Sequence, residues 1–169
     1  MKWITRSRPK IDLIACPWLI ARFIDKAPEF LYVPSDQVMA VAAQTGATPY
    51  DVPKVEYTHV GNDCSFDTFI KKHQLVERNG EHGKALQDMA AIVRGADTDR
   101  LELAPQAAGL LAISLGLSHN FQDDHQMLAH GMVIYDALYS WCCHAQGERH
   151  TWSYPPMLKP VPDWLVNPN

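Results

Sequence analysis

Charged side chains crowd the short segment Arg94–Arg100, which holds two arginines and two aspartates just before the uncharged stretch 103–117. Burying an isolated charge is costly, so charges this close to a core are either paired with one another or committed to a ligand. In the functional interpretation, Asp97 is a metal ligand or a base, and Arg94 or Arg100 holds an anion through its guanidinium group. In the structural interpretation, the segment is a polar corner between helices. The residues alone leave both open.

A second group of ligand-type side chains lies at the predicted start of the last helix, where His125 follows Asp123 and Asp124. A histidine beside two carboxylates suits a hard metal ion or general acid–base chemistry. The alternative is an acidic first turn that complements the helix dipole and leaves His125 exposed. We keep Asp124 and His125 as candidate metal ligands.

His59 starts a third group, because Cys64 follows it in the pattern H-x4-C and Asp67 comes shortly after. This spacing can present two ligands to one metal ion. A single such pair is weak evidence, and a histidine satisfied within the fold is the competing interpretation. We keep His59 as a candidate metal ligand.

Basic residues precede the first predicted helix, where Arg6, Arg8 and Lys10 lie upstream of Cys16. A helix N-terminus attracts anions and lowers the pKa of a thiol, so this segment is a candidate oxyanion site beside a reactive thiolate. The alternative is a solvated basic segment and a buried thiol, because free cysteine packs as a small hydrophobic residue.

The periodicity of apolar residues predicts the elements that position these groups. Two segments rich in β-branched and aromatic residues, Phe30–Val33 and Val55–Val60, are expected to pair as strands. Helices are expected from Cys16 or Pro17 to Asp25, from Ser35 to Gln44 with Gly46 as C-cap, over Phe66–His73 and Leu86–Gly95, as a buried helix over Pro105–Leu117, and from Asp123 or Asp124 past Cys142. The predicted fold class is mainly α (α+β): a single domain of five to six helices with a small two-stranded β-sheet.

Composition limits the function classes. The chain has 169 residues, 47% hydrophobic and 20% charged, with a formal charge of −4. These values are typical of one globular domain over 1–169, and they argue against general nucleic-acid binding. No segment is long and apolar enough to cross a bilayer, and the N-terminus lacks a signal-peptide segment, so we expect a cytoplasmic protein. Five prolines and two tryptophans predict an irregular tail from about residue 147.

Three long motifs carry a family resemblance. The segments Thr5–Asp25, His59–Asp67 (H-x4-C-S-F-D) and Ile92–Leu117 (beginning I-V-R-G-A-D-T-D-R) are similar to the chromate-resistance protein family, and more narrowly to the C-terminal domain of the chromate-responsive regulator ChrB. The resemblance implies a role in chromate or metal-stress resistance. Larger relatives have an additional N-terminal portion linked to regulation, which this chain lacks, so DNA-binding regulation is not expected. The family supplies no settled catalytic residues, so the site assignment is drawn from residue chemistry.

The leading hypothesis is a metal-binding protein. His59, Asp97, Asp124 and His125 would hold a divalent ion such as iron, manganese or zinc, which suit mixed nitrogen and oxygen ligands. In a metal-dependent redox or hydrolytic enzyme, Cys16, Arg94 and Arg100 would support catalysis on superoxide or another small oxyanion. The alternative is a non-catalytic module that senses chromate or binds a partner, with chromate held by the basic residues 6, 8 and 10. Whether the chain forms a homo-oligomer stays open.

Overall fold

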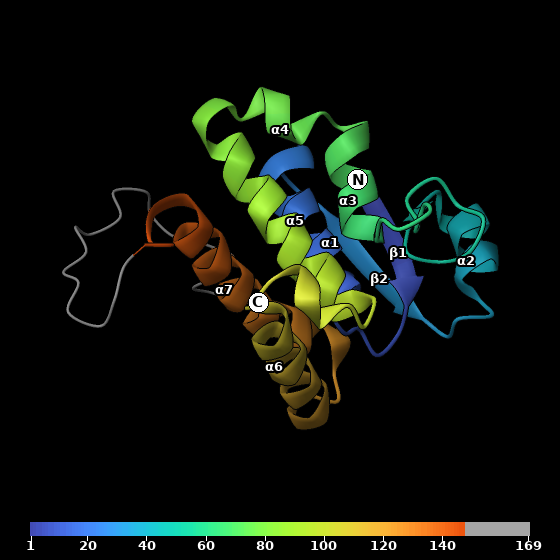
Figure 1. Cartoon of the computed structure of the whole chain (residues 1–169). Coiled ribbons are helices and arrows are strands. Elements are labelled where there is room, and N and C mark those ends of the chain that lie inside the picture. Colours follow the sequence, from blue (N-terminus) through green and yellow to red (C-terminus); the bar gives the residue numbers. More distant parts are fainter. Residues whose placement is uncertain (148–169) are drawn as a thin grey trace.

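A small parallel sheet lies beside a group of helices in the computed structural model, which describes residues 1–147 (Figure 1). The strands are β1 (Lys2–Arg6), β2 (Glu29–Val33) and β3 (Thr48–Pro49), in the spatial order β2-β1-β3. Both neighbours of β1 run parallel to it. Parallel neighbours need a crossover connection, and the helix between β1 and β2 provides it.

The sheet differs from the predicted two-stranded pair. The Phe30–Val33 strand is confirmed as part of β2, but its partner is β1 at the N-terminus, with Ile4 opposite Leu31. The prediction of a strand over Val55–Val60 is wrong, because this segment is a loop with only isolated bridges. The loop still contributes an aromatic side chain to the core, because the ring of Tyr57 stacks on that of Phe69 with centroids 4.2 Å apart.

The described residues are mainly helical, as predicted, with seven α-helices rather than five to six. The short α4 and the separate loop turns were not expected from the apolar periodicity. The helices are α1 (Asp12–Leu19), α2 (Val38–Thr45), α3 (Ser65–Lys72), α4 (Leu75–Arg78), α5 (Gly83–Asp97), α6 (Ala107–Asn120) and α7 (Asp124–His144), with a π-helical turn over Ile20–Ile24 and 3-10 turns over Gly80–His82 and Leu101–Leu103.

Helix boundaries follow local capping. Gly46 ends α2 with a left-handed φ of 70°, as predicted. Asp123 caps α7, because its side chain accepts a hydrogen bond of 2.8 Å from the amide of Gln126, also as predicted. The predicted start of the first helix at Cys16 or Pro17 is wrong: the helix starts at Asp12 and contains Pro17.

Helix α1 is the centre of the core. All of its residues are buried, and it contacts α3, α5 and α7. Two glycines permit the close approach of neighbouring helices. A Cβ atom at Gly131 of α7 would collide with the side chain of Ile14 on α1, and one at Gly95 of α5 would lie 2.9 Å from the Cβ of Ala107 on α6. The helix layers therefore depend on small residues at their contacts.

Helix α6 is the main departure from the predicted burial. The sequence predicts a buried helix over this uncharged stretch, but only Ala107, Leu110 and Ser114 of α6 are buried in the described structure. No helix in residues 1–147 combines the length and apolar character needed to cross a membrane. The tail expected from about residue 147 lies outside the described residues.

The Gly131→Ala substitution should destabilise the fold, because the added methyl group has no room beside Ile14. Overpacking of this kind costs about 1–3 kcal/mol, which urea unfolding would measure. Gly109→Ala on α6 is the matched control, since its added methyl group meets nothing within 4 Å. At low protein concentration, Gly109→Ala should leave the free energy of unfolding unchanged or raise it by up to about 1 kcal/mol, because alanine favours the helix over glycine. Equal effects of the two changes would contradict this packing.

Candidate metal centre

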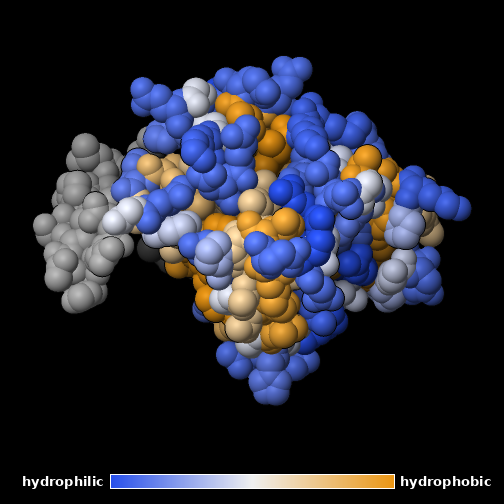
Figure 2. All heavy atoms as spheres, in the orientation of Figure 1, coloured by the Kyte–Doolittle hydropathy of each residue, from blue (hydrophilic) through white to orange (hydrophobic). Residues whose placement is uncertain are grey.

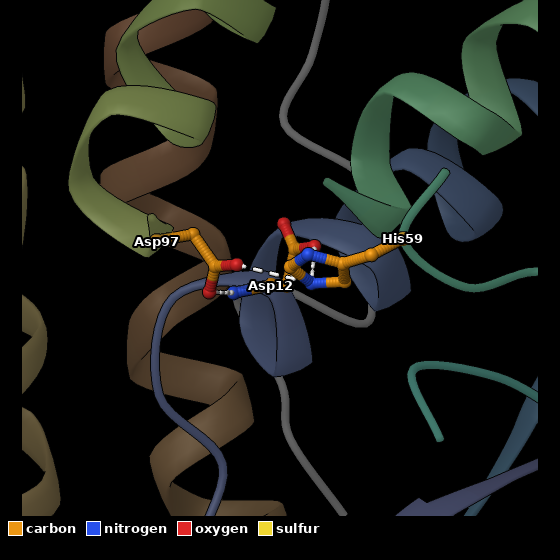
Figure 3. A group of neighbouring side chains, drawn as sticks. All are labelled: Asp12, His59 and Asp97. Carbon is orange, nitrogen blue, oxygen red and sulfur yellow. Dashed lines mark hydrogen bonds and ion pairs between the residues drawn. The ribbon is translucent and has the colours of Figure 1, made fainter. Parts of the chain in front are cut away.

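Three carboxylates face one ring nitrogen of His59. The Nε2 atom lies 3.2 Å from Asp97 Oδ2, 3.3 Å from Asp51 Oδ1 and 3.6 Å from Asp12 Oδ2. Figure 3 shows Asp12, His59 and Asp97 pointing toward one another from the start of α1, the loop before α3 and the end of α5. The start of α1, the loop that carries both Asp51 and His59, and the end of α5 thus meet at a single imidazole nitrogen.

Asp12 is the most deeply buried residue of the site, since its side chain is only 1% exposed. Its Oδ2 accepts hydrogen bonds from the backbone amides of Ser65 at 2.6 Å and Phe66 at 3.3 Å, which are the first residues of α3. A helix N-terminus favours a negative charge in this position. The second oxygen, Oδ1, is buried and has no hydrogen-bond partner among the described residues. A buried carboxylate oxygen without a hydrogen-bond partner is costly.

Asp51 is fixed from both sides. Its Oδ1 accepts a 2.6 Å hydrogen bond from the hydroxyl of Ser65, and its Oδ2 lies 3.0 Å from the guanidinium of Arg6. Arg6 also donates to the Asp51 carbonyl. The residue has a φ of 51°, in the left-handed region that aspartate tolerates better than most residues. The strand-end loop therefore holds this carboxylate in one place beside His59.

Asp97 is the last residue of α5, and its Oδ1 lies 3.4 Å from the backbone amide of Asp12, which donates to it. The chain turns sharply after it, because Asp99 adopts a left-handed φ of 54° and the Arg100 amide donates to the Gly95 carbonyl. This turn leaves the Asp97 carboxylate, 17% exposed, facing His59.

Arg94 and Arg100 connect the end of α5 to the loop that carries His59. Arg94 contacts Asp67 Oδ1 at 2.5 Å, and Arg100 donates to the Asn62 carbonyl at 2.8 Å. Asp67 in turn accepts from the amide of Cys64 and caps α3. Neither arginine has a described contact with the imidazole of His59, so in this structure they position the site rather than enter it.

Burial and mutual repulsion perturb the acidic groups of the centre. Burial raises the pKa of Asp12 well above its usual range, and the carboxylates of Asp97 and Asp51 raise it further. The pKa of Asp97 is raised by burial and by Asp51. For His59, the hydrogen bond to Asp51 raises the pKa to about 9 against the opposing effect of burial, and the charges of Asp12 and Asp97 add to the increase. Without a cation, the site therefore retains protons.

The predicted ligands separate into two places. His59 and Asp97 meet in the centre, whereas Asp124 and His125 lie at the start of α7 outside this group. The carboxylate of Asp124 lies 3.2 Å from the backbone amide of Arg8, which donates to it. The His125 ring packs edge-on against Tyr32, with ring centroids 5.3 Å apart. The structure therefore gives both residues local packing contacts.

Cys16 lies on the fully buried α1 rather than at an exposed helix start. Burial raises the pKa of its thiol, and the charge of Asp12 raises it further. This direction is opposite to the lowered pKa expected of a reactive thiolate at a helix N-terminus. Burial also raises the pKa of Cys64, whose Sγ lies 3.3 Å from Asp67 Oδ2. Both thiols remain protonated core groups.

The two arginines of the N-terminal basic segment already have partners, whereas Lys10 is exposed. Arg6 pairs with Asp51, as described above. Arg8 donates to backbone carbonyls at the end of α6 and in the following turn, at 2.5 Å to Ser118 and 2.9 Å to Phe121. A cation at a helix C-terminus satisfies carbonyls that have no intrahelical partner. The guanidinium groups predicted to hold an oxyanion are thus engaged within the fold.

The predicted ligand set omits Asp12 and Asp51. Asp12 has a sequence signal, because it stands in the Thr5–Asp25 motif between a charged segment and an otherwise apolar helix. The predicted helix starts at Cys16 or Pro17, which would leave Asp12 outside it. The helix starts at Asp12 instead, so this carboxylate is buried with the rest of α1. Asp51 has no comparable signal, since only the positive φ and the contacts with Arg6 and Ser65 bring it to His59.

Comparison with known proteins places this arrangement in a family. Residues 3–142 match the family described as ChrB, C-terminal domain. The chain belongs to the ChrB C-terminal domain family. The matched range contains all four residues of the centre, so the ChrB C-terminal domain includes the whole candidate site in this chain.

A curated relative gives the scale of the similarity. The chain is 27% identical over 139 residues to Protein ChrB of Cupriavidus metallidurans, and the match covers 82% of this chain and 40% of that protein. The chain thus spans less than half the length of this relative. No match was found among solved structures.

The stability of the metal-free protein should fall as the pH rises from about 6.5 to about 9. The raised pKa of His59 means that its protonated form stabilises the fold below 6.5, and that this contribution is lost as the pH passes 9. Asp12, whose pKa is also raised, contributes in the same direction. Urea unfolding in chelator at several pH values measures the slope. His59→Gln should reduce it, and the control His125→Gln should keep it. An unchanged slope in His59→Gln would contradict the assignment.

Proposed function

We propose that this ChrB C-terminal domain binds one divalent metal ion through Asp12, His59 and Asp97. The observation that carries the proposal is the convergence of these side chains on His59 Nε2, with ligand atoms of all three within 4.8 Å of one another. Donors that share an ion at about 2.1 Å lie roughly 3.4 Å apart in tetrahedral geometry. The distances of 3.2 and 3.6 Å from Nε2 to Asp97 and Asp12 match that spacing.

Electrostatics supports the same proposal. Three carboxylates gathered beside one imidazole repel one another, and burial of Asp12 adds a desolvation cost. A divalent cation beside Asp12 Oδ2, the oxygen that faces His59, would neutralise this charge. Burial and the neighbouring carboxylates raise the pKa of Asp12 and Asp97, and the hydrogen bond to Asp51 with the nearby carboxylates raises that of His59. Metal binding would therefore release protons.

The donor types favour iron, manganese or zinc. One imidazole nitrogen and two or more carboxylate oxygens suit these ions better than a soft thiolate-binding metal, and both nearby thiols are protonated. The His59 side chain is 42% exposed, so the centre is open on that side. An open coordination position beside three protein ligands is typical of a site that takes water or a small oxyanion.

Asp51 would act beside the ion rather than as a main ligand. Its carboxylate is already bound by Arg6 and Ser65, which lowers its availability for coordination. It remains 3.3 Å from His59 Nε2, close enough to accept a hydrogen bond from a group on the ion. Such neighbouring carboxylates orient ligands and tune a metal centre.

Family membership supports a role for this centre in chromate or metal-stress resistance. The match to the ChrB C-terminal domain covers the entire site, and the relative named Protein ChrB contains this domain within a longer chain. We infer that the metal centre is the working part of the domain, in redox or hydrolytic chemistry or in sensing. The alternative of a metal-free chromate site has less support, because Arg6 and Arg8 are engaged in the fold.

Metal binding can be measured on protein stripped with chelator and free of any histidine tag. Titration with manganese, zinc and anaerobic ferrous ion, followed by elemental analysis, should give one ion per chain. His59→Gln and Asp97→Asn should weaken binding by more than the roughly 10–100-fold that loss of an outer-shell group costs. Asp124→Asn and His125→Gln are the controls and should bind like the parent. Full occupancy in both site variants would refute the proposal.

Asp12→Asn should separate stability from metal binding. The raised pKa of Asp12 means that its charge destabilises the metal-free fold near neutral pH, and an amide keeps an oxygen for the Ser65 amide. We expect the metal-free variant to melt about 2–4 °C higher, the shift that ~1 kcal/mol gives in a domain of this size. Added metal should raise the melting temperature of the parent but not of the variant. A variant that melts lower without metal would show that the carboxylate is structural.

A further inference from the structure

Helix α6 presents an apolar face to solvent. The exposed positions of the helix fall in two rows, 108-112-115-119 and 109-113-116-120, which share one side of the helix. Ile113 is 47% exposed and Leu115 is 46% exposed. We name this surface the α6 face, made of Ala108, Gly109, Ala112, Ile113, Leu115 and Gly116.

The apolar surface extends beyond the helix. Leu101 and Leu103, in the 3-10 turn that contacts α6, are 38% and 36% exposed. Figure 2 shows hydrophobic residues gathered over α6 and this turn, between hydrophilic regions. No Asp, Glu, Lys or Arg occurs from Leu103 to Gln122. A continuous apolar patch with a polar border marks an interaction surface on a globular protein.

The shape of the α6 face suits another helix. The spacing of four and three residues along each row is that of helix–helix interfaces, where ridges of one helix enter grooves of the other. Ile113 forms a ridge between Gly109 and Gly116, and a Cβ atom at either glycine would meet nothing within 4 Å. The face therefore offers both a projecting side chain and the hollows that could receive one.

We propose that the α6 face is covered by the α6 face of a second copy of this chain. Two antiparallel α6 helices would cross near Ala112, with Ile113 of each copy beside the glycines of the other. In a two-fold interface the same patch meets itself, so a charged patch repels its copy and an uncharged one does not. A different protein partner is commonly matched by complementary charges, and this face has none to offer.

The size of the face fits a weak dimer. A helix of 14 residues is about 21 Å long and about 10 Å wide, so two such faces with the adjoining leucines bury on the order of 1,000 Å². Stable interfaces bury about 1,200–2,000 Å². The dimer should therefore dissociate on dilution, with a Kd on the order of micromolar.

Sedimentation velocity over a concentration series tests the proposal on the full chain. The parent should shift from monomer toward dimer as the concentration passes the micromolar range. Ile113→Glu should stay monomeric at every concentration, because dimerisation would bury the new carboxylates of both copies in the apolar interface. Met39→Glu is the matched control: Met39 is 55% exposed on α2, away from α6 in Figure 1, and the variant should dimerise like the parent. Circular dichroism confirms that each variant is folded.

Disulfide trapping tests the geometry independently. Ala112→Cys should form a covalent dimer under mild oxidation, because near a two-fold crossing its Cα atoms approach within the roughly 4.4–6.8 Å that a disulfide spans. Met39→Cys and the parent, with its native cysteines, give the background. A parent that remains monomeric at high concentration overturns the proposal. So does a dimer that Ile113→Glu leaves intact, or one that Ala112→Cys does not trap above background.

Discussion

The hydrogen bonds made at Asp12, by its buried side-chain oxygen and its backbone amide, are the interactions on which the rest of the site depends. Asp12 is the first residue of α1; its carboxylate accepts the leading amides of α3 and faces His59, while its own amide donates to Asp97. One residue thus joins the central helix to α3, to the loop before it and to the end of α5. The ion pair of Arg94 with Asp67 and the hydrogen bond from Arg100 to the Asn62 carbonyl reinforce the same junction from outside. Packing of α1 in the core fixes this carboxylate, and the other elements arrange around it.

The carboxylates of this centre repel one another. Burial and the neighbouring carboxylates raise the pKa of Asp12 and of Asp97, and the imidazole of His59, 3.6 Å away, is a cationic group that faces Asp12. Natural folds keep such unfavourable clusters where function requires them. Asp51 illustrates the distinction, because Arg6 and Ser65 already stabilise it, whereas Asp12 retains a buried oxygen without a partner. A divalent ion would offset the repulsion, which is why metal binding is the function the site supports best.

Of the four residues that meet at the centre, His59 and Asp97 are candidates from the sequence and Asp12 and Asp51 are not. His59 and Asp97 stand out because each is a ligand-type residue in a conspicuous motif. Asp124 and His125 were chosen on the same grounds, but the start of α7 lies against Arg8 and Tyr32. The strand predicted over Val55–Val60 failed because β1 occupies the centre of the sheet, a choice set by long-range pairing. Local patterns do not encode which distant segments meet.

The sequence alone was enough for the family, the mainly helical class and the caps of α2 and α7, since all of these reside in local residue patterns. Only the tertiary structure decided that Asp12 and Asp51 join His59 and Asp97, because three separate segments must fold before those carboxylates lie within 4 Å of Nε2. It also decided that α6, apolar enough to predict burial, leaves one face exposed. Apolar composition indicates that a helix is to be buried against a neighbour, and only the packing shows which face of the helix has no neighbour.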